Sequence, residues 1–462
     1  MYVSSIGILN DGKILVSGNV SFTGSSLEYG SARLNPDGSR DLSFPPFPQS
    51  IGAGKLTSWQ DRFYVGTAQL VRRLTPSGLI DASFHDLNDN APSFSSGQGG
   101  DYHVYPDGSV VITGYHIVNV PDSGWQNIYC LIWFNNDGTL DLTRQPRYGN
   151  GTINLIVPQP DGKFLLSGSC TTWEGVPTPN IFRVHANGTL DTSFNCAIGW
   201  GEAASITVLE DERILVSGLF KTSFSSPDTL HFVRLMPDGS LDPTFNNDLE
   251  VVRMPWLASE WPGNTINWGQ FTIPRHTRLT DGRIALHGSH WWVEGQERFG
   301  IAMLDADGNL LDEPFAGGGC GRYYNAGTGY LYGNIDGIIE APDGFLYIWG
   351  GYKGYDDGTT NDPTQRFVSR LYGLNVGVRE QEQPGMRVYP NPASANVIVE
   401  LERVSVRSEL VLRDALGRTV LRQRVSGTNA SFSIQHLSDG IYGMQLLVGN
   451  APVASQKLVI QH

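Results

Sequence analysis

The sequence predicts an all-β protein in which about seven blades of four antiparallel strands form a β-propeller, followed by an immunoglobulin-like β-sandwich. Three observations predict this fold. A hairpin pattern recurs along most of the chain, a second hairpin pattern precedes most of its copies, and residues 386–462 follow a different pattern of short alternating strands. The composition agrees, because 55 glycines, 26 prolines and 17% charged residues are typical of strands joined by many turns.

The first hairpin pattern is clearest at residues 232–245, FVRLMPDGSLDPTF. An apolar strand ends at a Pro-Asp-Gly turn, where glycine tolerates a positive φ, and a second short strand follows. Related copies lie at 32–44, 72–84, 133–144, 182–194 and 302–315. An acid follows most turns and an arginine precedes most of them: Asp41, Asp81, Asp141, Asp191 and Asp242, and Arg33, Arg73, Arg183 and Arg234. We expect these residues to form structural ion pairs or to cap the turns, not to act as catalytic acids.

The second hairpin pattern lies at 8–18, 104–114, 158–168, 208–218, 278–288 and 340–350, with a less regular copy at 57–66. Its second strand is apolar at consecutive positions, which is typical of a strand covered on both faces. The strand then ends in a glycine, which predicts a bulge or a close approach of neighbouring backbone. Two hairpins make one four-stranded blade. The last blade lacks its fourth strand, so either residues 375–378 supply that strand or a segment upstream of the chain completes the ring.

The paired hairpins resemble the delta-60 repeat family over about residues 3–375, through the recurring motif R-L-x-P-D-G-S-L-D-x-x-F. Members of that family are predicted to form β-propellers in large bacterial surface proteins. The resemblance therefore implies an architecture, and it transfers no catalytic residue and no cofactor. We expect the propeller at residues 1–376, a polar linker at 377–385 and the sandwich at 386–462.

The C-terminal sandwich carries short motifs at fixed places: Tyr389, Pro390, Asn391 and Pro392 at its entry, Gly417 in its middle, Gly440 and Tyr442 before a late strand, and Lys457 near the end. In this order they resemble the type A C-terminal sorting domain of type IX secretion substrates in the Bacteroidetes. The resemblance implies a protein that is secreted or attached to the outer-membrane surface by the type IX secretion machinery. The alternative is an ordinary immunoglobulin-like module that binds a ligand itself. The first residues do not follow a signal-peptide layout, so we expect the true N-terminus to lie upstream.

Charge and cysteine content exclude several classes of function. A net charge of −14 argues against a nucleic-acid partner, and no apolar run approaches the roughly 20 residues of a membrane helix. The four cysteines form no CxxC pair, so we expect no metal site. Antiparallel strand order predicts that Cys170 and Cys196 lie at the same end of one blade, which favours a disulfide; two buried thiols are the alternative. We expect a monomer.

Aromatic residues on one face of the propeller are the candidate binding site. The tight turns all lie at one end of the blades, so the longer loops share the other end, and such loops often carry function. On this loop-rich face we place Trp125, Trp173, Trp256, Trp261, Trp268, Trp291, Trp292, Tyr352 and Tyr355. Their rings suit stacking on sugars or anchoring of a protein partner. The alternative is that they fill gaps between blades.

Three functions remain open from the sequence. We favour a surface propeller that binds a glycan or a protein. The second is a polysaccharide hydrolase or lyase that uses Glu250 with Glu260, or Glu294 with Glu297. Its mechanism needs two carboxylates about 5–10 Å apart. The sequence contains no GxSxG, HExxH or Walker motif that would support an enzyme, and we assign no catalytic residue. The third is a structural spacer. His287 and His290 flank the Trp291–Trp292 pair and are the histidines least easily assigned to a structural role.

Overall fold

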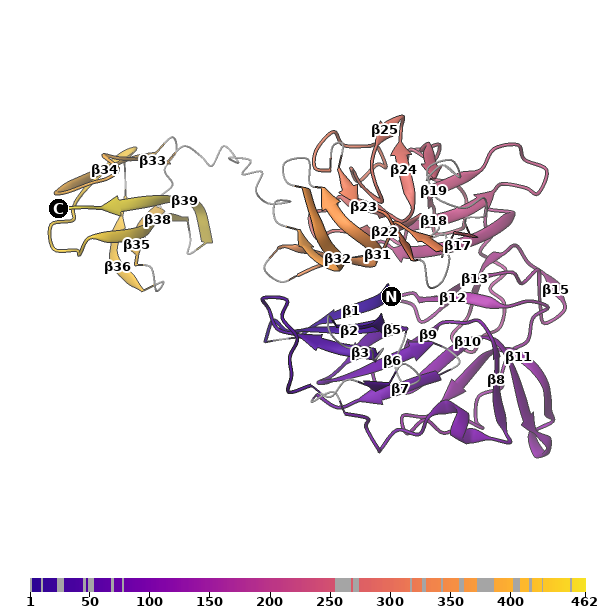
Figure 1. Cartoon of the computed structure of the whole chain (residues 1–462). Coiled ribbons are helices and arrows are strands. Elements are labelled where there is room, and N and C mark those ends of the chain that lie inside the picture. The colour runs from indigo at the N-terminus through magenta and orange to yellow at the C-terminus, as the bar shows by residue number, and fades with distance from the viewer. Residues whose placement is uncertain are drawn as a thin grey trace. The chain divides into compact units, whose positions relative to one another are not determined.

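The protein divides into two compact units, Met1–Tyr372 and Gly373–His462, in a computed structural model (Figure 1). The structure describes residues 2–9, 11–22, 29–44, 47–48, 54–67, 70–76, 79–253, 267–268, 274–315, 318–325, 330–341, 344–356, 361–371, 386–401, 408–414, 418–425, 427–448 and 451–462. These residues form strands and two short 3-10 helices, η2 (Leu87–Asn90) and η3 (Pro121–Ser123). The all-β prediction is confirmed.

In the first unit, each repeat forms an antiparallel sheet, which we name by its second strand. The β2 sheet contains β1 (Tyr2–Ile8), β2 (Ile14–Val20), β3 (Tyr29–Leu34) and β4 (Phe47–Pro48). The β6 sheet contains β5 (Lys55–Trp59), β6 (Arg62–Thr67) and β7 (Leu70–Leu74). The β10 sheet contains β8 (Phe94–Gln98), β9 (Tyr102–Val104), β10 (Val110–Val120) and β11 (Trp125–Phe134). The β13 sheet contains β12 (Ile153–Pro158), β13 (Phe164–Gly168) and β16 (Ile181–Val184).

The second half of this unit continues the series. The β18 sheet contains β17 (Trp200–Val208), β18 (Ile214–Lys221) and β19 (Leu230–Leu235). The β23 sheet contains β22 (Arg275–Arg278), β23 (Ile284–His287) and β26 (Ile301–Leu304). The β31 sheet contains β27 (Gly319–Cys320), β30 (Asn334–Glu340), β31 (Leu346–Asp356) and β32 (Asn361–Leu371).

Small ribbons lie in the connections between these strands. One consists of β14 (Thr172–Trp173) and β15 (Val176–Pro177), and another of β20 (Val251–Arg253), β24 (His290–Val293) and β25 (Gln296–Glu297). A third joins β21 (Asn267–Trp268), β28 (Tyr323–Asn325) and β29 (Tyr330–Tyr332).

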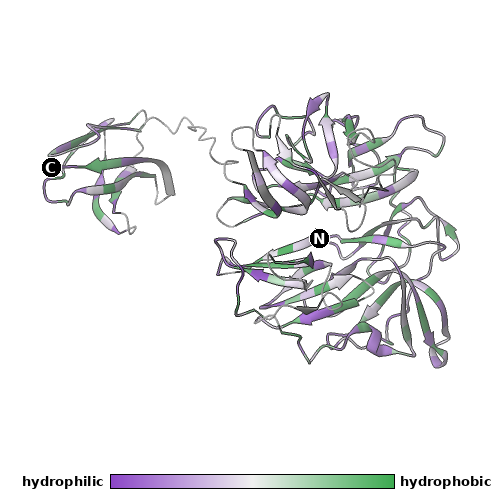
Figure 2. Ribbon diagram, in the orientation of Figure 1, coloured by the Kyte–Doolittle hydropathy of each residue, from purple (hydrophilic) through white to green (hydrophobic). Residues whose placement is uncertain are grey.

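The second strand of a repeat is buried on both faces, as its consecutive apolar residues predict. All five residues of β13 and all four of β23 are buried, and Figure 2 shows hydrophobic colour concentrated in such strands. A Cβ added at the closing glycines Gly168, Gly218 and Gly350 would lie 2.1 to 2.3 Å from a carbonyl oxygen in the first strand or, for Gly168, in the residue just before it. The predicted close approach of backbone is therefore confirmed at these positions, and a register shift lies beside each one.

Hydrophobic cores lie between neighbouring sheets. Leu131 and Trp133 of β11, for example, pack with Phe164 and Phe182 of the β13 sheet. The first and last sheets also share a core, which contains Val3 and Tyr347 among its residues. Trp349 Nε1 donates a hydrogen bond to the Ser4 carbonyl at 3.0 Å across this contact. The β31 sheet thus packs against the β2 sheet, while the predicted outer strand at 375–378 lies outside the described residues.

The second unit consists of two sheets around one core. The first contains β33 (Met386–Tyr389), β34 (Asn396–Leu401) and β37 (Asn429–Ser433), and the second contains β35 (Ser408–Arg413), β36 (Thr419–Arg424), β38 (Gly440–Val448) and β39 (Ala451–Ile460). Val397 and Phe432 from the first sheet share the core with Leu410, Met444 and Leu458 from the second. The predicted linker, residues 377–385, lies outside the described residues. Within the part of the chain that the structure describes, no helix has the length and apolar character needed to cross a membrane.

Candidate functional site

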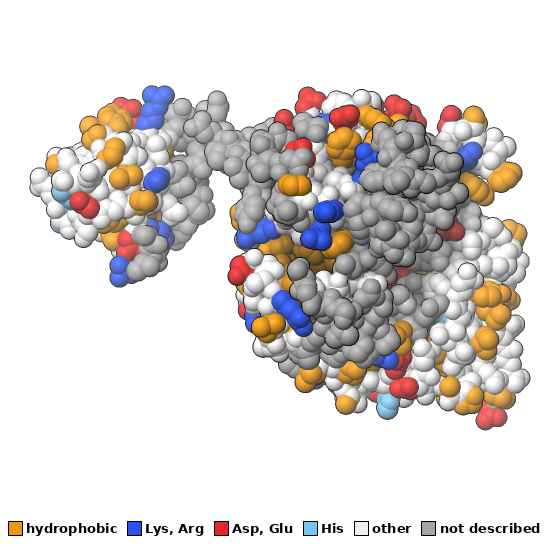
Figure 3. All heavy atoms as spheres, viewed as in Figure 1, with side chains coloured by type: hydrophobic (Ala, Val, Ile, Leu, Met, Phe, Trp, Pro, Cys, Tyr) orange, Lys and Arg blue, Asp and Glu red, His pale blue; other side chains and the backbone are white. Residues whose placement is uncertain are grey.

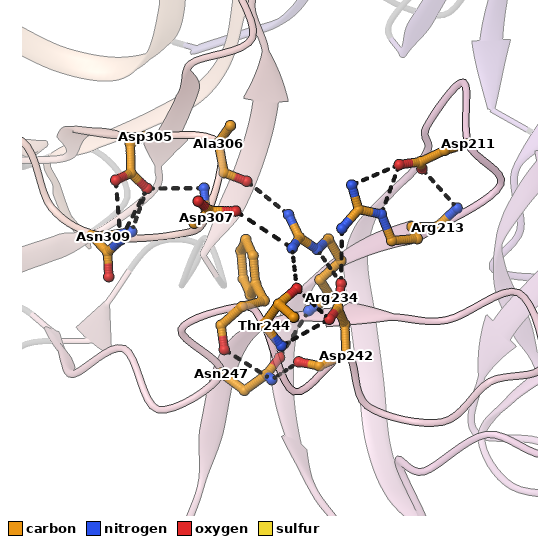
Figure 4. Close-up of polar contacts among 11 residues, drawn as sticks. Asp211, Arg213, Arg234, Asp242, Thr244, Asn247, Asp305, Ala306, Asp307 and Asn309 are labelled. Atoms are coloured by element: carbon orange, nitrogen blue, oxygen red, sulfur yellow. Dashed lines mark hydrogen bonds and ion pairs between the residues drawn. The ribbon is translucent and has the colours of Figure 1, made fainter.

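The repeated arginine and aspartate form a buried clamp in each of four repeats. In the β18 sheet, Arg234 Nε donates to Asp242 Oδ2 at 2.7 Å, and Asp242 Oδ1 accepts from Thr244 N and Oγ1 at 2.9 and 2.6 Å (Figure 4). Arg213, which follows the preceding tight turn, donates to the same carboxylate at 3.1 Å. Equivalent bonds of 2.8, 2.6 and 2.8 Å join the pairs Arg33–Asp41, Arg73–Asp81 and Arg183–Asp191. The predicted structural ion pairs are confirmed.

The clamp also joins one sheet to the next. Arg234 Nη1 donates to the carbonyl of Ala306, in the turn of the β23 sheet, at 2.8 Å (Figure 4). The Arg234 guanidinium lies 4.7 Å from the centre of the Phe245 ring, and a Cβ on Gly308 would lie 2.5 Å from that ring. The arginine, aspartate, phenylalanine and glycine of the repeat are therefore all used to pack neighbouring sheets.

Electrostatics exclude a general-acid role for these aspartates. Burial raises the pKa of Asp242, yet hydrogen bonds from Thr244 and Arg234 outweigh burial and hold that pKa well below its usual range. The same balance lowers the pKa of Asp81 to about 2. Each carboxylate therefore stays charged at neutral pH, whereas a general acid needs a raised pKa.

The loop-rich face lies at the ends of the sheets opposite the tight turns, but several predicted site residues are not exposed there. Trp173 is fully buried, because the β14–β15 ribbon folds back along its sheet and Trp173 Nε1 donates to the Gly188 carbonyl at 2.9 Å. Tyr352 is fully buried, with its hydroxyl 2.5 Å from Ser369 Oγ, and Tyr355 is 7% exposed. These three side chains are therefore buried in this structure and do not present the exposed rings that we expected on the loop-rich face.

The Trp291–Trp292 pair is half-buried on β24. The two rings meet edge to face with centroids 5.4 Å apart, and the Arg322 guanidinium lies 4.1 Å from the Trp291 centroid. Trp125 is also half-buried, near the tip of the long β10–β11 hairpin. Trp256 and Trp261 lie outside the described residues, and Trp268 lies in β21, paired with Leu331.

Two exposed aromatic residues of this face were missed by the sequence analysis. Trp200, at the loop-side end of β17, is 42% exposed, and Phe224, in the β18–β19 connection, is 78% exposed. Their rings meet edge to face with centroids 5.8 Å apart. Glu202 lies two residues from Trp200 on the same strand face, and its Oε2 accepts from Asn154 Nδ2 at 3.0 Å. Two features of the sequence could have indicated this pair: Trp200 lies between two glycines, and Phe224 lies in a serine-rich loop.

The structure describes three of the four glutamates that were predicted to form acid pairs. Glu250 N donates to Glu294 Oε1 at 2.8 Å, so the carboxylate of Glu294 caps a neighbouring backbone. Glu294 is exposed in the turn of the β24–β25 ribbon, Glu297 is exposed on β25, and Glu260 lies outside the described residues. Because a capping carboxylate is already engaged, this arrangement adds no support to a hydrolytic mechanism.

The histidines beside the tryptophan pair are closed to solvent. His287 and His290 are 2% and 1% exposed, and burial lowers the pKa of each to about 3. His287 Nδ1 lies 3.2 Å from the Ile335 carbonyl and therefore donates to it. Among the described residues, no cluster of three histidines, cysteines or acids is arranged to hold a metal ion.

The predicted Cys170–Cys196 disulfide is absent, since all four cysteines are buried free thiols. Cys170 lies in the core between the β10 and β13 sheets, and Cys196 lies in the next core, with Phe220. Cys196 stays at the turn end of the sheets, because Asn195 N donates to the Asp238 carbonyl in the next repeat turn at 2.7 Å. The segment after Asp191 is thus too short to bring Cys196 to the end where Cys170 lies.

The C-terminal motif residues hold the second unit together. Asn391 Nδ2 donates to the Lys457 carbonyl and Asn391 Oδ1 accepts from Val459 N, both at 2.8 Å, so the entry segment is bound to the last strand. The Tyr442 hydroxyl donates to the Ser438 carbonyl at 2.8 Å. Tyr389 donates to Glu400, Lys457 is exposed, and Gly417 lies outside the described residues.

Acidic and basic side chains are mixed on the visible surface of the described residues. Figure 3 shows acidic and basic side chains interspersed over the visible part of the described residues. This distribution, with the net charge of −14, does not provide the clustered lysines and arginines that a phosphate backbone needs.

Comparisons with known proteins identify both parts of the chain. Residues 387–461 match the secretion system C-terminal sorting domain. Residues 9–44, 159–194, 209–245 and 279–310 match the domain of unknown function DUF5122 β-propeller. A search of curated proteins found no match.

Matches among solved structures include PorZ, a surface component of the type IX secretion system of Porphyromonas gingivalis, with 12% identity and a TM-score of 0.38 over 99% of this chain. The extracellular domain of a putative hybrid two component system from B. thetaiotaomicron has 10% identity and a TM-score of 0.40 over 100% of this chain. The chain spans 59% and 56% of the length of these two structures. The sorting domain indicates a secreted or cell-surface protein that uses the type IX secretion machinery. The chain therefore carries β-propeller repeats of the DUF5122 family and ends in a type IX secretion sorting domain.

Proposed function

We propose that this surface protein binds a glycan through the loop-rich face of its propeller, at a site formed by Trp200, Phe224 and Glu202. The propeller has seven blades, and the second unit is an immunoglobulin-like sandwich that directs export. The blade count is supported by the chain of contacts around the first unit, in which each repeat sheet packs on the next and the β31 sheet packs on the β2 sheet.

The observation that carries the proposal is the exposed Trp200–Phe224 pair. A phenylalanine that is 78% exposed beside a tryptophan that is 42% exposed gains nothing from core packing. Two rings at an interplanar angle of 75° form a corner of apolar surface, onto which the C–H face of a sugar ring stacks.

Polar groups next to the rings favour a sugar over a purely apolar ligand. Glu202 and Asn154, joined by a hydrogen bond of 3.0 Å, supply a carboxylate and an amide that bind hydroxyl groups. Lys221 lies opposite Trp200 across the strand pair, with its Nζ donating to the Ser226 carbonyl at 2.8 Å. A flat ring flanked by fixed polar groups is the usual composition of a small-ligand site.

The test is binding of the full chain to a panel of bacterial, plant and animal glycans, followed by titration calorimetry on each glycan that binds. We expect the Trp200→Ala/Phe224→Ala variant to bind roughly 10-fold more weakly or worse, from the loss of ring stacking. A Trp291→Ala/Trp292→Ala variant tests the other aromatic pair of the face. Leu142→Ala is the matched control, because Leu142 is 55% exposed but follows a repeat turn.

The outcomes separate the candidate functions. Loss of binding in the first variant alone supports the proposed site, and loss in the second alone moves the site to β24. Release of reducing ends from a bound polysaccharide would instead favour the hydrolase. Absence of glycan binding refutes the proposal and favours a protein partner or a structural spacer.

A further inference from the structure

We propose that Cys130 and Cys170 form a disulfide in the exported protein and thereby join the β10 sheet to the β13 sheet. The proposal rests on the two thiols sharing one core and on the export that the sorting domain implies. It does not depend on glycan binding.

Both thiols lie against one short backbone segment, residues 149–151. Cys130 lies on β11 and Cys170 lies two residues beyond β13, and both are 0% exposed within a single core. Cys130 Sγ lies 3.3 Å from the Gly151 carbonyl oxygen and 3.8 Å from that of Gly149. A Cβ added to Gly149 would lie 2.6 Å from Cys170 Sγ. Both sulfurs therefore contact the same glycine.

The glycines leave room for the bond. Gly149 and Gly151 have no side chain that could separate the two sulfurs, and the backbone around Cys170 is held by hydrogen bonds from Thr171 N and Thr172 N to Asn150 Oδ1. Cys170 Sγ donates a weak hydrogen bond to the Thr172 carbonyl, at 3.0 Å. A disulfide needs Cβ atoms about 3.8 Å apart, and both cysteines are free thiols in this structure, so the two segments that carry them must move together for the bond to form.

The other two cysteines have no such neighbour. Cys196 lies in the core between the β13 and β18 sheets, and that core contains no second cysteine. Cys320 lies on β27 opposite Tyr355, and a Cβ on Gly300 would lie 2.6 Å from its sulfur. A correctly folded chain therefore has one candidate bridge and two isolated thiols.

The bond forms while the chain folds after export. Burial raises the pKa of Cys130 to about 12, so the folded thiol is protonated and unreactive. In the unfolded chain, one thiolate attacks the disulfide of an oxidised dithiol oxidoreductase or of oxidised glutathione and forms a mixed disulfide. The second thiolate then displaces the carrier sulfur. The protein loses two electrons and two protons, and the carrier leaves as its reduced thiol.

The first experiment counts free thiols in full-length protein that has been refolded with a glutathione redox buffer. The protein is denatured without reductant, alkylated, digested and analysed by mass spectrometry. We expect two alkylated cysteines, Cys196 and Cys320, and one cross-linked peptide pair containing Cys130 and Cys170 that separates after reduction. Four alkylated cysteines, or a bridge that contains Cys196 or Cys320, would overturn the proposal.

The second experiment measures the effect of the bond on stability. We expect reductant to lower the melting temperature of the oxidised wild type by roughly 5 °C and to leave a Cys130→Ser/Cys170→Ser variant unchanged. A Cys196→Ser/Cys320→Ser variant is the matched control, and it should keep the full response to reductant. A wild type that does not respond to reductant, or a control variant that loses its response, contradicts the assignment.

Discussion

Replacing Asp81 with alanine tests whether the repeated acid stabilises the propeller. Asp81 is 6% exposed, its Oδ2 accepts from Arg62 and from Arg73 Nε at 2.6 Å, and its Oδ1 accepts from Ser83 Oγ at 2.6 Å. Burial raises the pKa of Asp81, but these hydrogen bonds have the larger effect and lower that pKa from 3.8 to about 2. By linkage, a shift of this size corresponds to about 2 kcal/mol of stability at neutral pH.

Loss of the carboxylate also leaves the buried Arg73 guanidinium without its anionic partner. Arg73 is 4% exposed and would keep uncharged partners, such as the Asn136 carbonyl at 2.9 Å and the Trp59 ring at 5.2 Å, in place of the carboxylate. We therefore expect Asp81→Ala to lower the free energy of unfolding by about 3 kcal/mol. Asp141→Ala is the matched control, because Trp133 replaces the arginine of that repeat and Asp141 Oδ1 accepts from Thr143. Loss of this turn cap alone should cost about 1 kcal/mol.

Urea denaturation, followed by tryptophan fluorescence, measures both changes. The folded pKa of Asp81 lies below its unfolded value, so its contribution is complete above about pH 4 and is lost as the pH falls from about 4 to 2. The gap between wild type and Asp81→Ala should therefore stay constant from pH 7 to 5 and shrink below pH 4. Equal losses for Asp81→Ala and Asp141→Ala, or a gap that does not change with acid, would refute the clamp.

Three further changes have defined outcomes. Gly308→Ala should unfold at lower urea than Gly282→Ala, because both glycines have a positive φ but only the Cβ at Gly308 meets the Phe245 ring, at 2.5 Å. The folded pKa of buried His287 is about 3 and its unfolded pKa about 6.5, so stability falls as the pH drops below 6.5, by up to about 1.4 kcal/mol per pH unit for this residue. His287→Gln should flatten the dependence of unfolding free energy on pH, and an unchanged slope would contradict the buried neutral state. Asn391→Ala removes both bonds to the last strand, so we expect a less stable sorting domain and less protein in the secreted fraction by immunoblot; normal export would show that the clamp is dispensable.

The sequence could predict what repeats and what depends on near neighbours. The Arg234–Asp242 pair is predictable because the two residues face each other across one hairpin, eight positions apart. The close approach at Gly168 is predictable because only glycine tolerates a carbonyl oxygen 2.1 Å from the position of a Cβ. Since such features are local, periodic spacing is sufficient to identify them.

Connections between strands could not be predicted in this way. The position of Trp173 depends on a ribbon that folds back along its own sheet, so a residue expected on the loop-rich face lies in the core. The environment of Cys196 depends on a bond between Asn195 and the turn of the next repeat, more than 40 residues away. In both cases the deciding partner is distant in sequence, and hydrophobic patterning gives no information about it.

The same division explains where function is expected in this protein. The motif residues of the repeat are engaged in packing between sheets, as Arg234 shows by binding Asp242 in its own sheet and Ala306 in the next. Because a change at such a position weakens two sheets at once, we expect residues outside the motif to form the proposed glycan site. Trp200 and Phe224 meet this condition, since both lie in segments that differ from one repeat to the next and neither contributes to the core that its sheet shares with its neighbours.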